Sequence, residues 1–346
     1  MQTERDPRLD AAKGVLIALV VLGHLFEAVN YWRDAAIRLP LTAIYLFHMP
    51  AFVFMAGVTA GTRRVARRVA TMLVLLVGFQ AVYYLVLSQV ESGKRFSWTE
   101  PFWVLWFLLA MAWWQALAPW IVRAPRRAFA LAVIAALLAG SLPPVIGGEL
   151  ALSRTLVFLP FFVAGKIWGT RLVERAGHAS AAQRWASLIA CLVAIALAFS
   201  VGIGHTWLYA SHSFETLGVG VVQGMATRAA LLSAAALCIW TLLAFLPAQP
   251  SPRLSVTGRR SLAIYLLHAP LLLAITPALS GLVVQQGGIA AWLLCVIAAA
   301  GVLALLSVPG PDRWLRTGAA TVVEAGAALP DTVRSERTDE ASSSER

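Results

Sequence analysis

The stretch IYLFHMPAFVFMAG, residues 44–57, contains almost only apolar side chains, but it has His48 near its centre and Pro50 two residues later. An apolar run of this kind is typical of a membrane-spanning helix, in which an ionisable ring is costly and a proline interrupts the backbone hydrogen bonds. A polar residue kept at such a depth is a candidate functional residue. The rest of the chain shows whether this segment crosses a membrane and what meets His48 there.

The composition points to an all-α polytopic membrane protein. The chain has 346 residues, of which 59% are hydrophobic and 13% are charged, and its apolar residues fall into many separate runs. A water-soluble domain cannot bury that much apolar surface. The formal net charge of +11 is attributed to basic cytoplasmic loops, so we expect no nucleic-acid partner. Residues 1–14 hold Glu4, Asp6 and Asp10 and precede no cleavage site, so the first apolar run is expected to be a spanning helix rather than a cleaved signal.

Ten segments have the length and hydropathy of a spanning helix. They are residues 12–31, 40–61, 69–90, 102–121, 128–146, 154–170, 185–204, 226–246, 260–280 and 288–308. When the connections are numbered alternately, 22 of the 28 Lys and Arg residues fall on one side, which the positive-inside rule assigns to the cytoplasm. A missed or extra helix would disturb this alternation. We therefore expect about ten transmembrane helices in one bundle, with both termini in the cytoplasm of a cell and the bundle in its inner (plasma) membrane.

The chain is expected to have two parts. Residues 1–310 would form the transmembrane domain, and residues 311–346, which end in SERTDEASSSER, have the polar composition of a disordered cytoplasmic tail. Cys191, Cys238 and Cys295 lie far apart inside apolar runs, so neither a disulfide nor a metal site is predicted. No internal repeat is evident along the chain, and this weakens an interpretation as a transporter built from inverted halves.

Three histidines are predicted to meet near the middle of the membrane. His24 lies eleven residues after Lys13, which corresponds to a rise of about 16 Å from the inner side. His48 lies about 12–13 Å below the outer side on the second segment, and His268 rises about 12 Å from the inner end of the ninth. In a hydrocarbon core about 30 Å thick, His24 and His48 reach nearly the same depth.

Each of these histidines also has a purely structural alternative. His24 and His268 could be neutral rings that hydrogen-bond to neighbouring helices, and His48 could mark a kink by bonding a carbonyl that Pro50 frees. Glu27 follows His24 by three residues and therefore shares its helix face. A carboxylate beside an imidazole orients the ring and raises its basicity, as a general base requires, although Glu27 could also be a solvated residue at the helix end.

Two further groups are candidate binding residues. Arg63, Arg64 and Arg67, with Arg68, form a cytoplasmic cluster after the second segment, and arginine side chains match the oxygens of phosphate groups. Basic residues at this place can also serve only to orient the helices. On the outer side, Arg154 opens the sixth segment, and Trp103 and Trp106 open the fourth. Aromatic faces beside an arginine suit a sugar ring, although tryptophan is common at any membrane interface.

Several blocks of the sequence resemble the membrane acyltransferase 3 family, within it the branch that is similar to fucose 4-O-acetylases. RLDAAKGVLIALVVLGH resembles the opening of the family, with Lys13, ten intervening residues and His24. YLFHMPAFVFMAG resembles its second block, and Arg64 and Arg67 match its R-x-x-R motif. WVLWFLLAMAWW, RTLVFLPFFVAGK and GRRSLAIYLLH resemble later blocks, and the likeness covers about residues 6–310. Many members carry an acidic residue in the region of the fourth helix, where this chain has none.

The resemblance implies an O-acyltransferase that moves an acyl group, commonly acetyl, from cytoplasmic acyl-CoA (acetyl-CoA) to a hydroxyl of a carbohydrate. The acceptor could be a cell-surface glycan, an exopolysaccharide or a lipid-linked sugar, and no bound cofactor is implied. His24 would act as base or carry the acyl group, and His48 would orient it or stabilise the oxyanion, with Glu27 beside them. The remaining residues are assigned to binding the two substrates. Lys13, Arg63, Arg64 and Arg67 would bind the phosphates of CoA, and Arg154, Trp103, Trp106 and His268 would bind the sugar.

Two other functions remain open at the level of the sequence. A proton-coupled transporter or exporter of a sugar-linked or small molecule could use the histidines as a proton relay, although such carriers more often show intramembrane carboxylate pairs. An acyltransferase could also act on a lipid or a peptide. The acceptor position, the length of the acyl group and the oligomeric state have no signature in the sequence.

Overall fold

The computed structural model describes residues 6–30, 32–33, 35–90, 96–143, 149–286 and 288–325, and within these ranges all regular structure is helical. The α-helices are α1 (Pro7–Asn30), α2 (Ala35–Thr59), α3 (Val65–Val90), α4 (Trp106–Arg123), α5 (Pro125–Leu138), α7 (Leu152–Gly177), α8 (Ala181–Ser200), α9 (His205–Leu208), α10 (Val221–Phe245), α11 (Pro252–Arg259), α12 (Ser261–Gln286) and α13 (Gly288–Leu306). Three short 3₁₀ turns are η1 (Trp103–Leu105), η2 (Ala139–Ser141) and η3 (Glu149–Ala151). The predicted all-α polytopic architecture is confirmed.

Nine helices in the described part of the chain are long and apolar enough to cross a membrane. They correspond to nine of the ten predicted segments, and the exception is the fifth, expected over residues 128–146. There the structure has the 14-residue α5 followed by η2. The fifth segment therefore falls short of the length of a spanning helix within the described residues, because Pro125 starts a new helix directly after α4 and leaves fewer residues for the crossing.

The short α5 nevertheless connects the same two ends of the bundle as its neighbours. It begins beside Arg123, at the end that the charge rule places in the cytoplasm. Just beyond its last residue, the carbonyl of Gly140 accepts a hydrogen bond from the backbone N–H of Phe214, in the outer segment before α10, at 2.6 Å. At the same outer end, the N–H of Leu150 bonds the carbonyl of Thr99. The alternation of inner and outer connections along the chain is thus preserved.

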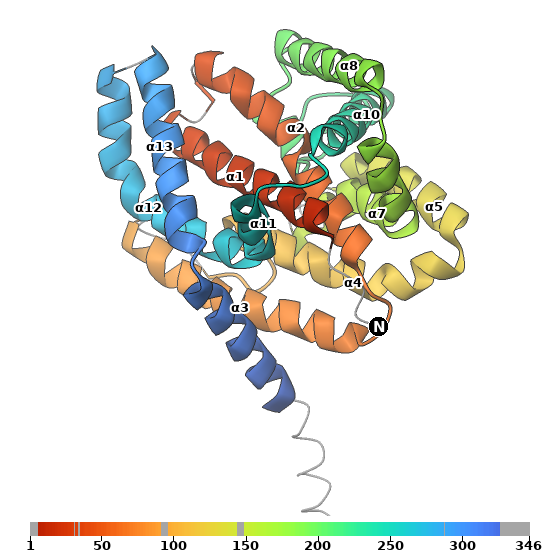
Figure 1. Ribbon diagram of the computed structural model, residues 1–346, viewed down its shortest axis with the longest axis horizontal. Coiled ribbons are helices and arrows are strands. Elements are labelled where there is room, and N and C mark those ends of the chain that lie inside the picture. Colours follow the sequence, from red (N-terminus) through yellow and green to blue (C-terminus); the bar gives the residue numbers. More distant parts are fainter. Residues whose placement is uncertain are drawn as a thin grey trace, which may run out of the picture.

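Helices α1 and α2 lie in the middle of the bundle, with α12 and α13 along one side and α5, α7 and α8 along the other (Figure 1). The packing of α2 against α7 is close because glycines meet backbone. A Cβ added at Gly57 would collide with the carbonyl of Phe162, and one at Gly165 with the carbonyl of Phe54. Small residues that let backbones approach are typical of helix pairs in membranes, where no hydrophobic force drives helices together. This contact fixes the inner half of α2.

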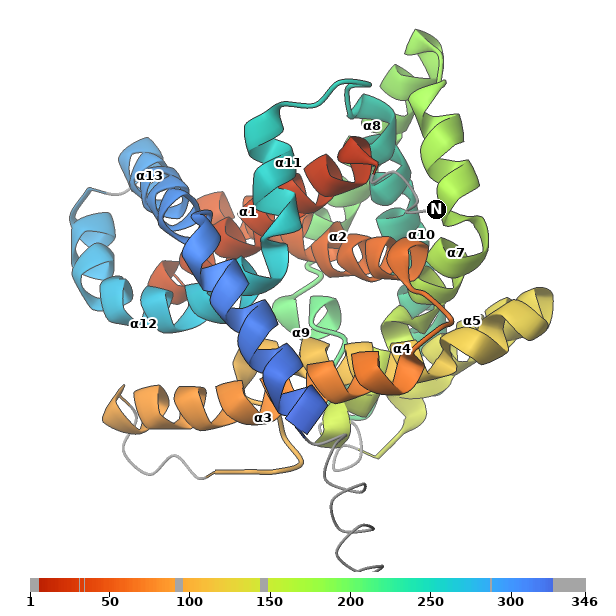
Figure 2. The ribbon, with the colours of Figure 1, turned by 60° about the horizontal axis from the view of Figure 1, so that its bottom comes forward.

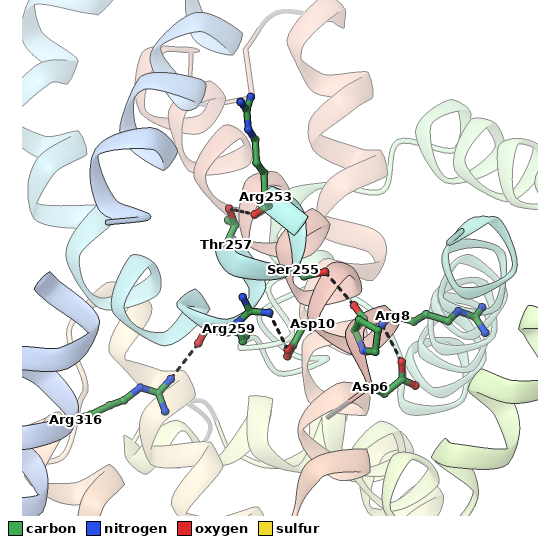
Figure 3. A network of polar contacts seen from close by, with 9 residues as sticks. Asp6, Arg8, Asp10, Arg253, Ser255, Thr257, Arg259 and Arg316 are labelled. Carbon is green, nitrogen blue, oxygen red and sulfur yellow. Dashed lines mark hydrogen bonds and ion pairs between the residues drawn. The ribbon is translucent and has the colours of Figure 1, made fainter. Parts of the chain in front are cut away.

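The inner end of α1 is held by the short helix α11, which lies directly against it (Figure 2). The hydroxyl of Ser255 donates to the carbonyl of Pro7 at 3.3 Å, and Arg259 forms an ion pair with the buried Asp10 at 3.9 Å (Figure 3). From the far side, Arg316 donates to the carbonyl of Arg259 at 3.0 Å. These contacts tie the first and last thirds of the chain together at the inner face.

One expectation from the sequence needs revision. Residues 309–325 are helical, and Glu324 forms an ion pair with Arg67, so this part of the predicted disordered tail is ordered against α3; residues 326–346 lie outside the described residues. Separately, the packing of α8 against α10 brings the free thiols of Cys191 and Cys238 to 3.0 Å from one another. The boundary between the two predicted parts at residue 310 stays a prediction.

Candidate active site

A cavity of about 660 Å³ lies among the outer halves of the central helices. One part of its wall is polar and holds six residues that the sequence singled out, and the other part is apolar. The polar and aromatic part is formed by His24, Glu27, Tyr45, His48, Trp103, Trp106, Arg154, Tyr209 and Tyr265. The apolar part includes Leu87, Phe102, Leu272, Leu273 and Pro277, from the outer end of α3, the loop before η1 and the second half of α12.

His24 projects from α1 into this cavity and is held on its other side by a second histidine. Its Nδ1 lies 2.8 Å from Nε2 of His268 on α12, and the two rings are nearly parallel, with 5.1 Å between centroids. The ring of Trp103 lies 5.1 Å from that of His24. His268 is completely buried. It was expected to hold the sugar, but it lies behind His24 and outside the lining of the cavity.

His48 lines the same cavity from α2, and its Nδ1 lies 2.8 Å from the carbonyl oxygen of Ile44. The carbonyl that Pro50 frees belongs to Leu46, four residues before it. The proposed kink role, in which the ring bonds the freed carbonyl, is therefore wrong. Since the carbonyl of Ile44 can only accept, Nδ1 of His48 donates, and in the uncharged ring Nε2 is left as an acceptor.

Glu27 has partners other than the expected His24. Its carboxylate accepts hydrogen bonds from the hydroxyl of Tyr45 at 2.5 Å and from the indole N–H of Trp32 at 3.5 Å. The same indole N–H lies 3.2 Å from the hydroxyl of Tyr209. Glu27 therefore anchors an aromatic wall of the cavity, formed by Trp32, Tyr45 and Tyr209, on the outer side of His24.

Arg154 enters the cavity from the start of α7. Its Nε donates to the carbonyl of Tyr209 at 3.1 Å, and its guanidinium lies over the ring of Trp106 at 5.0 Å. Leu150 and Ala151, which precede α7, have φ values of 52° and 53°, in the left-handed region that L-residues rarely adopt. This strained turn sets the start of α7 so that Arg154, in its first turn, reaches the cavity.

The outer segment before α10 covers this side of the site. The ring of His205 lies 5.8 Å from that of Trp32 and 5.3 Å from that of Tyr209. Burial lowers the pKa of His205 below its usual value. Burial, and then the positive charge of Arg154, lowers the pKa of His212. Both shifts favour the uncharged ring, and the ring of His205 extends the aromatic wall without adding charge to it.

The basic residues assigned to the donor lie at the other end of the bundle. Arg63, Arg64 and Arg67 are exposed at the inner face, and Arg67 pairs with Glu324. Lys13 lies in the first third of α1 and is half-buried. Lys13 lies eleven residues before His24 on α1, a rise of about 16 Å, and none of these four basic residues lines the cavity.

Sequence reasoning missed two features of this site. Tyr45, Tyr209 and Tyr265 line the cavity. In the sequence, a tyrosine in an apolar run does not indicate a functional site, because its hydroxyl is the only polar group it adds. The second feature was visible: AIYLFHMP at residues 43–50 and AIYLLHAP at residues 263–270 are identical at six of eight positions. The expectation that the chain has no internal repeat is therefore wrong at this short length, and both copies stand at the site.

Two comparisons with known proteins found matches to this chain. A family model described as an acyltransferase domain matches residues 6–308. The nodulation protein NolL of Sinorhizobium fredii is 29% identical over 223 residues, which cover 54% of this chain and 56% of that protein. The nodulation protein NolL of Mesorhizobium japonicum is 44% identical over 55 residues, 15% of each chain. The chain thus spans about half the length of the first relative and less of the second. No solved structure matches it.

Proposed function

Because this multi-pass membrane protein belongs to the acyltransferase 3 family, we propose that it transfers an acyl group, acetyl in the simplest case, from cytoplasmic acyl-CoA to a hydroxyl group of a carbohydrate. The family match supports an acyltransferase rather than the transporter interpretation. The donor, the acceptor and the location in the inner membrane are the proposed parts.

One observation carries the proposal: a histidine with a fixed partner lies at the wall of a large cavity that also holds an arginine, a carboxylate and aromatic rings. His24 is held from behind by His268 at 2.8 Å, while Glu27, Arg154 and Trp106 line the same space. A base that is oriented by a second group beside a substrate-sized cavity is the arrangement that acyl transfer to a hydroxyl requires. The cavity volume of about 660 Å³ lies within the range of small-molecule sites.

The proposed reaction uses the free nitrogen of His24. Nε2 takes the proton of the acceptor hydroxyl as the hydroxyl oxygen attacks the thioester carbonyl. The C–S bond then breaks, and the thiolate of CoA receives the proton from His24, so the base is restored. A route through an acyl group on Nε2 would use the same lone pair in two steps. In both routes His48, with its own Nε2 as an acceptor, is assigned to a second contact with the reacting groups.

The donor would bind from the inner face. Arg63, Arg64 and Arg67 are exposed there and offer planar donors for phosphate groups, with Lys13 nearby on α1. Lys13 and His24 are separated by eleven residues, a rise of about 16 Å. Only the narrow thioester arm of the donor has to cover this distance, whereas the phosphates stay at the surface.

The acceptor would occupy the outer part of the cavity. Arg154 and Trp106 form a stacked pair there, and Trp103 and the aromatic wall next to Glu27 provide faces for a sugar ring. The apolar part of the cavity, with Leu87, Leu272 and Leu273, favours a lipid-linked sugar over a free glycan because it can hold the start of an alkyl chain.

Radiolabelled acetyl-CoA tests the proposal in membranes that contain the full chain. The assay compares wild type, His24→Ala and the control His178→Ala, which changes an exposed histidine outside the cavity. It is run with surface polysaccharide and, in a second arm, with a lipid extract that contains lipid-linked sugars. We expect labelled carbohydrate from wild type and from His178→Ala only. Equal labelling by His24→Ala would disprove the role of His24.

The same assay separates the remaining alternatives. Label on a lipid without sugar, or on a peptide, would show that the acceptor is not a carbohydrate. Label that remains on the wild-type protein after a rapid quench, and is absent from His24→Ala, would indicate the two-step route through the histidine. Loss of labelling in an Arg64→Ala, Arg67→Ala double variant that saturating acetyl-CoA restores would support the donor site.

A further inference from the structure

The two copies of the repeated octapeptide have the same local geometry. In the first, Nδ1 of His48 lies 2.8 Å from the carbonyl of Ile44. In the second, Nδ1 of His268 lies 3.1 Å from the carbonyl of Ile264 and 2.7 Å from that of Tyr265. A backbone carbonyl only accepts, so Nδ1 of each ring carries the proton. Each uncharged ring therefore offers Nε2 as an acceptor.

The second copy is held more firmly than the first. Pro270 frees the carbonyl of Leu266, and the hydroxyl of the buried Tyr83 donates to it at 3.1 Å. The hydroxyl of Tyr265 donates to the carbonyl of Val104. The bend of α12 at this point is thus supported from α3 and from η1, and His268 is fixed in its place behind α1.

The tautomer of His268 decides that of His24. Since Nε2 of the uncharged His268 has no proton, the 2.8 Å contact requires that Nδ1 of His24 donates. The uncharged His24 then has no proton on Nε2, and this nitrogen keeps its lone pair. An isolated histidine side chain in water prefers the opposite form, with the proton on Nε2, which is inactive as a base at that atom.

We propose that His268 is a positioning residue that keeps His24 in the Nδ1–H tautomer, with Nε2 as the base. The chain of donors runs from His24 to His268 and from His268 to the carbonyls of Ile264 and Tyr265. When Nε2 takes a proton, the positive charge on His24 strengthens its hydrogen bond to His268. No carboxylate takes part, because Glu27 is bound to Tyr45 and Trp32. This assignment rests on the proposed function, in which His24 is the base.

The repeat also separates the tasks of the two motif histidines. His48 and His268 stand on helices that run in opposite directions past α1, and both present Nε2. Nε2 of the fully buried His268 accepts the hydrogen bond from His24, whereas His48 lines the cavity. The same sequence thus supplies a support for the base on one side and a free acceptor for a substrate on the other.

Nitrogen-15 NMR of the full chain in lipid bilayers tests the assignment without any activity measurement. With ¹⁵N-labelled histidine, we expect a ¹⁵N–¹⁵N correlation between Nδ1 of His24 and Nε2 of His268, and an unprotonated Nε2 on His24. The correlation should disappear in His268→Phe and persist in the control His178→Phe. A wild-type spectrum in which His24 is protonated at Nε2 and unprotonated at Nδ1 would overturn the proposal.

Kinetics supply the second measurement. His268→Phe keeps a ring of similar size but removes the acceptor, and we expect kcat to fall by about 100- to 10,000-fold, as for loss of the correct tautomer elsewhere, with KM little changed. His268→Gln can place an amide oxygen near the same position and should recover part of kcat. An unchanged kcat in a folded His268→Phe would overturn the proposal. The two proposals can fail separately. If the wild-type protein showed the ¹⁵N–¹⁵N correlation but His24→Ala retained activity, the proposed function would fail and the tautomer assignment would stand.

Discussion

At the scale of single residues, the interaction of Arg154 with Trp106 gives a direct test of the acceptor site. Arg154→Lys keeps the charge but loses the planar stacking and the Nε donor to the carbonyl of Tyr209. A cation–π contact contributes roughly 0.5–2 kcal/mol, so we expect KM for the acceptor to rise by about 2- to 30-fold with a smaller change in kcat. Steady-state kinetics with varied acceptor measure this effect.

The chain provides a matched control for this substitution. Arg123 also stacks on a tryptophan, Trp120, at 4.8 Å, but at the inner end of α4 and away from the cavity. Arg123→Lys should leave the KM for the acceptor unchanged. An equal rise of KM in both variants would contradict a specific role of Arg154.

The positions of the site residues could be predicted from the sequence, but their pairings could not. Depth counting along each segment placed His24, His48 and His268 near one level, because helix rise is regular. It gave no information on which way each ring turns around its helix axis. The pairing of His24 with His268, and of Glu27 with Tyr45, depends on helix rotation and on the bend at Pro270, which only tertiary packing determines.

At the scale of helices, the contact between α2 and α7 predicts a sharp difference between two glycines. In Gly165→Ala the new Cβ would meet the carbonyl of Phe54, which belongs to the backbone and cannot rotate away. Overpacking of this kind destabilises proteins by about 1–3 kcal/mol. We expect a lower midpoint of thermal unfolding in detergent, measured by tryptophan fluorescence.

Gly78 is the control, since it lies within α3 and a Cβ there meets no atom within 4 Å. Gly78→Ala should leave the unfolding midpoint unchanged or raise it slightly, because alanine favours helix more than glycine. An equal unfolding midpoint for Gly165→Ala and Gly78→Ala would contradict the close packing of α2 against α7.

The helix boundaries show which parts of the fold the sequence predicts and which it does not. Nine spanning segments follow from apolar runs of sufficient length, and the structure has them. The fifth predicted segment is shortened because Pro125 follows Arg123 so closely that α4 and α5 meet at a single non-helical residue, Ala124, with φ −140° and ψ 66°. The octapeptide repeat was missed for another reason: it lacks the length of a structural repeat, and its meaning depends on α2 and α12 both flanking α1.

At the scale of the whole molecule, the orientation in the membrane can be tested with two cysteine substitutions in a cysteine-free background. Trp98, in the loop before η1, is 77% exposed, and His178, at the end of α7, is also exposed. Since the charge rule places the first outside and the second in the cytoplasm, a membrane-impermeable thiol reagent should label Trp98→Cys in intact cells and His178→Cys only after lysis. The reverse pattern would invert the topology and the proposed sides of donor and acceptor.

The shortness of α5 has a consequence for the lipid around the protein. With η2, it rises about 27 Å, less than a typical hydrocarbon core of about 30 Å. Its side chains Leu131, Ile134 and Leu138 are exposed toward the surroundings. Such hydrophobic mismatch is relieved by local thinning of the bilayer. We therefore expect the unfolding midpoint in reconstituted bilayers to fall as acyl chains lengthen beyond 18 carbons, and a midpoint independent of chain length would contradict this.

If that dependence holds, the protein deforms the membrane on one flank only. Helix α12 on the opposite side has 26 residues and is long enough to cross a bilayer of ordinary thickness, so lipids beside α5 would be drawn thinner than those beside α12. A membrane that is thick and stiff would then exert a sideways force on the bundle, and the protein would partition into thinner, more fluid regions.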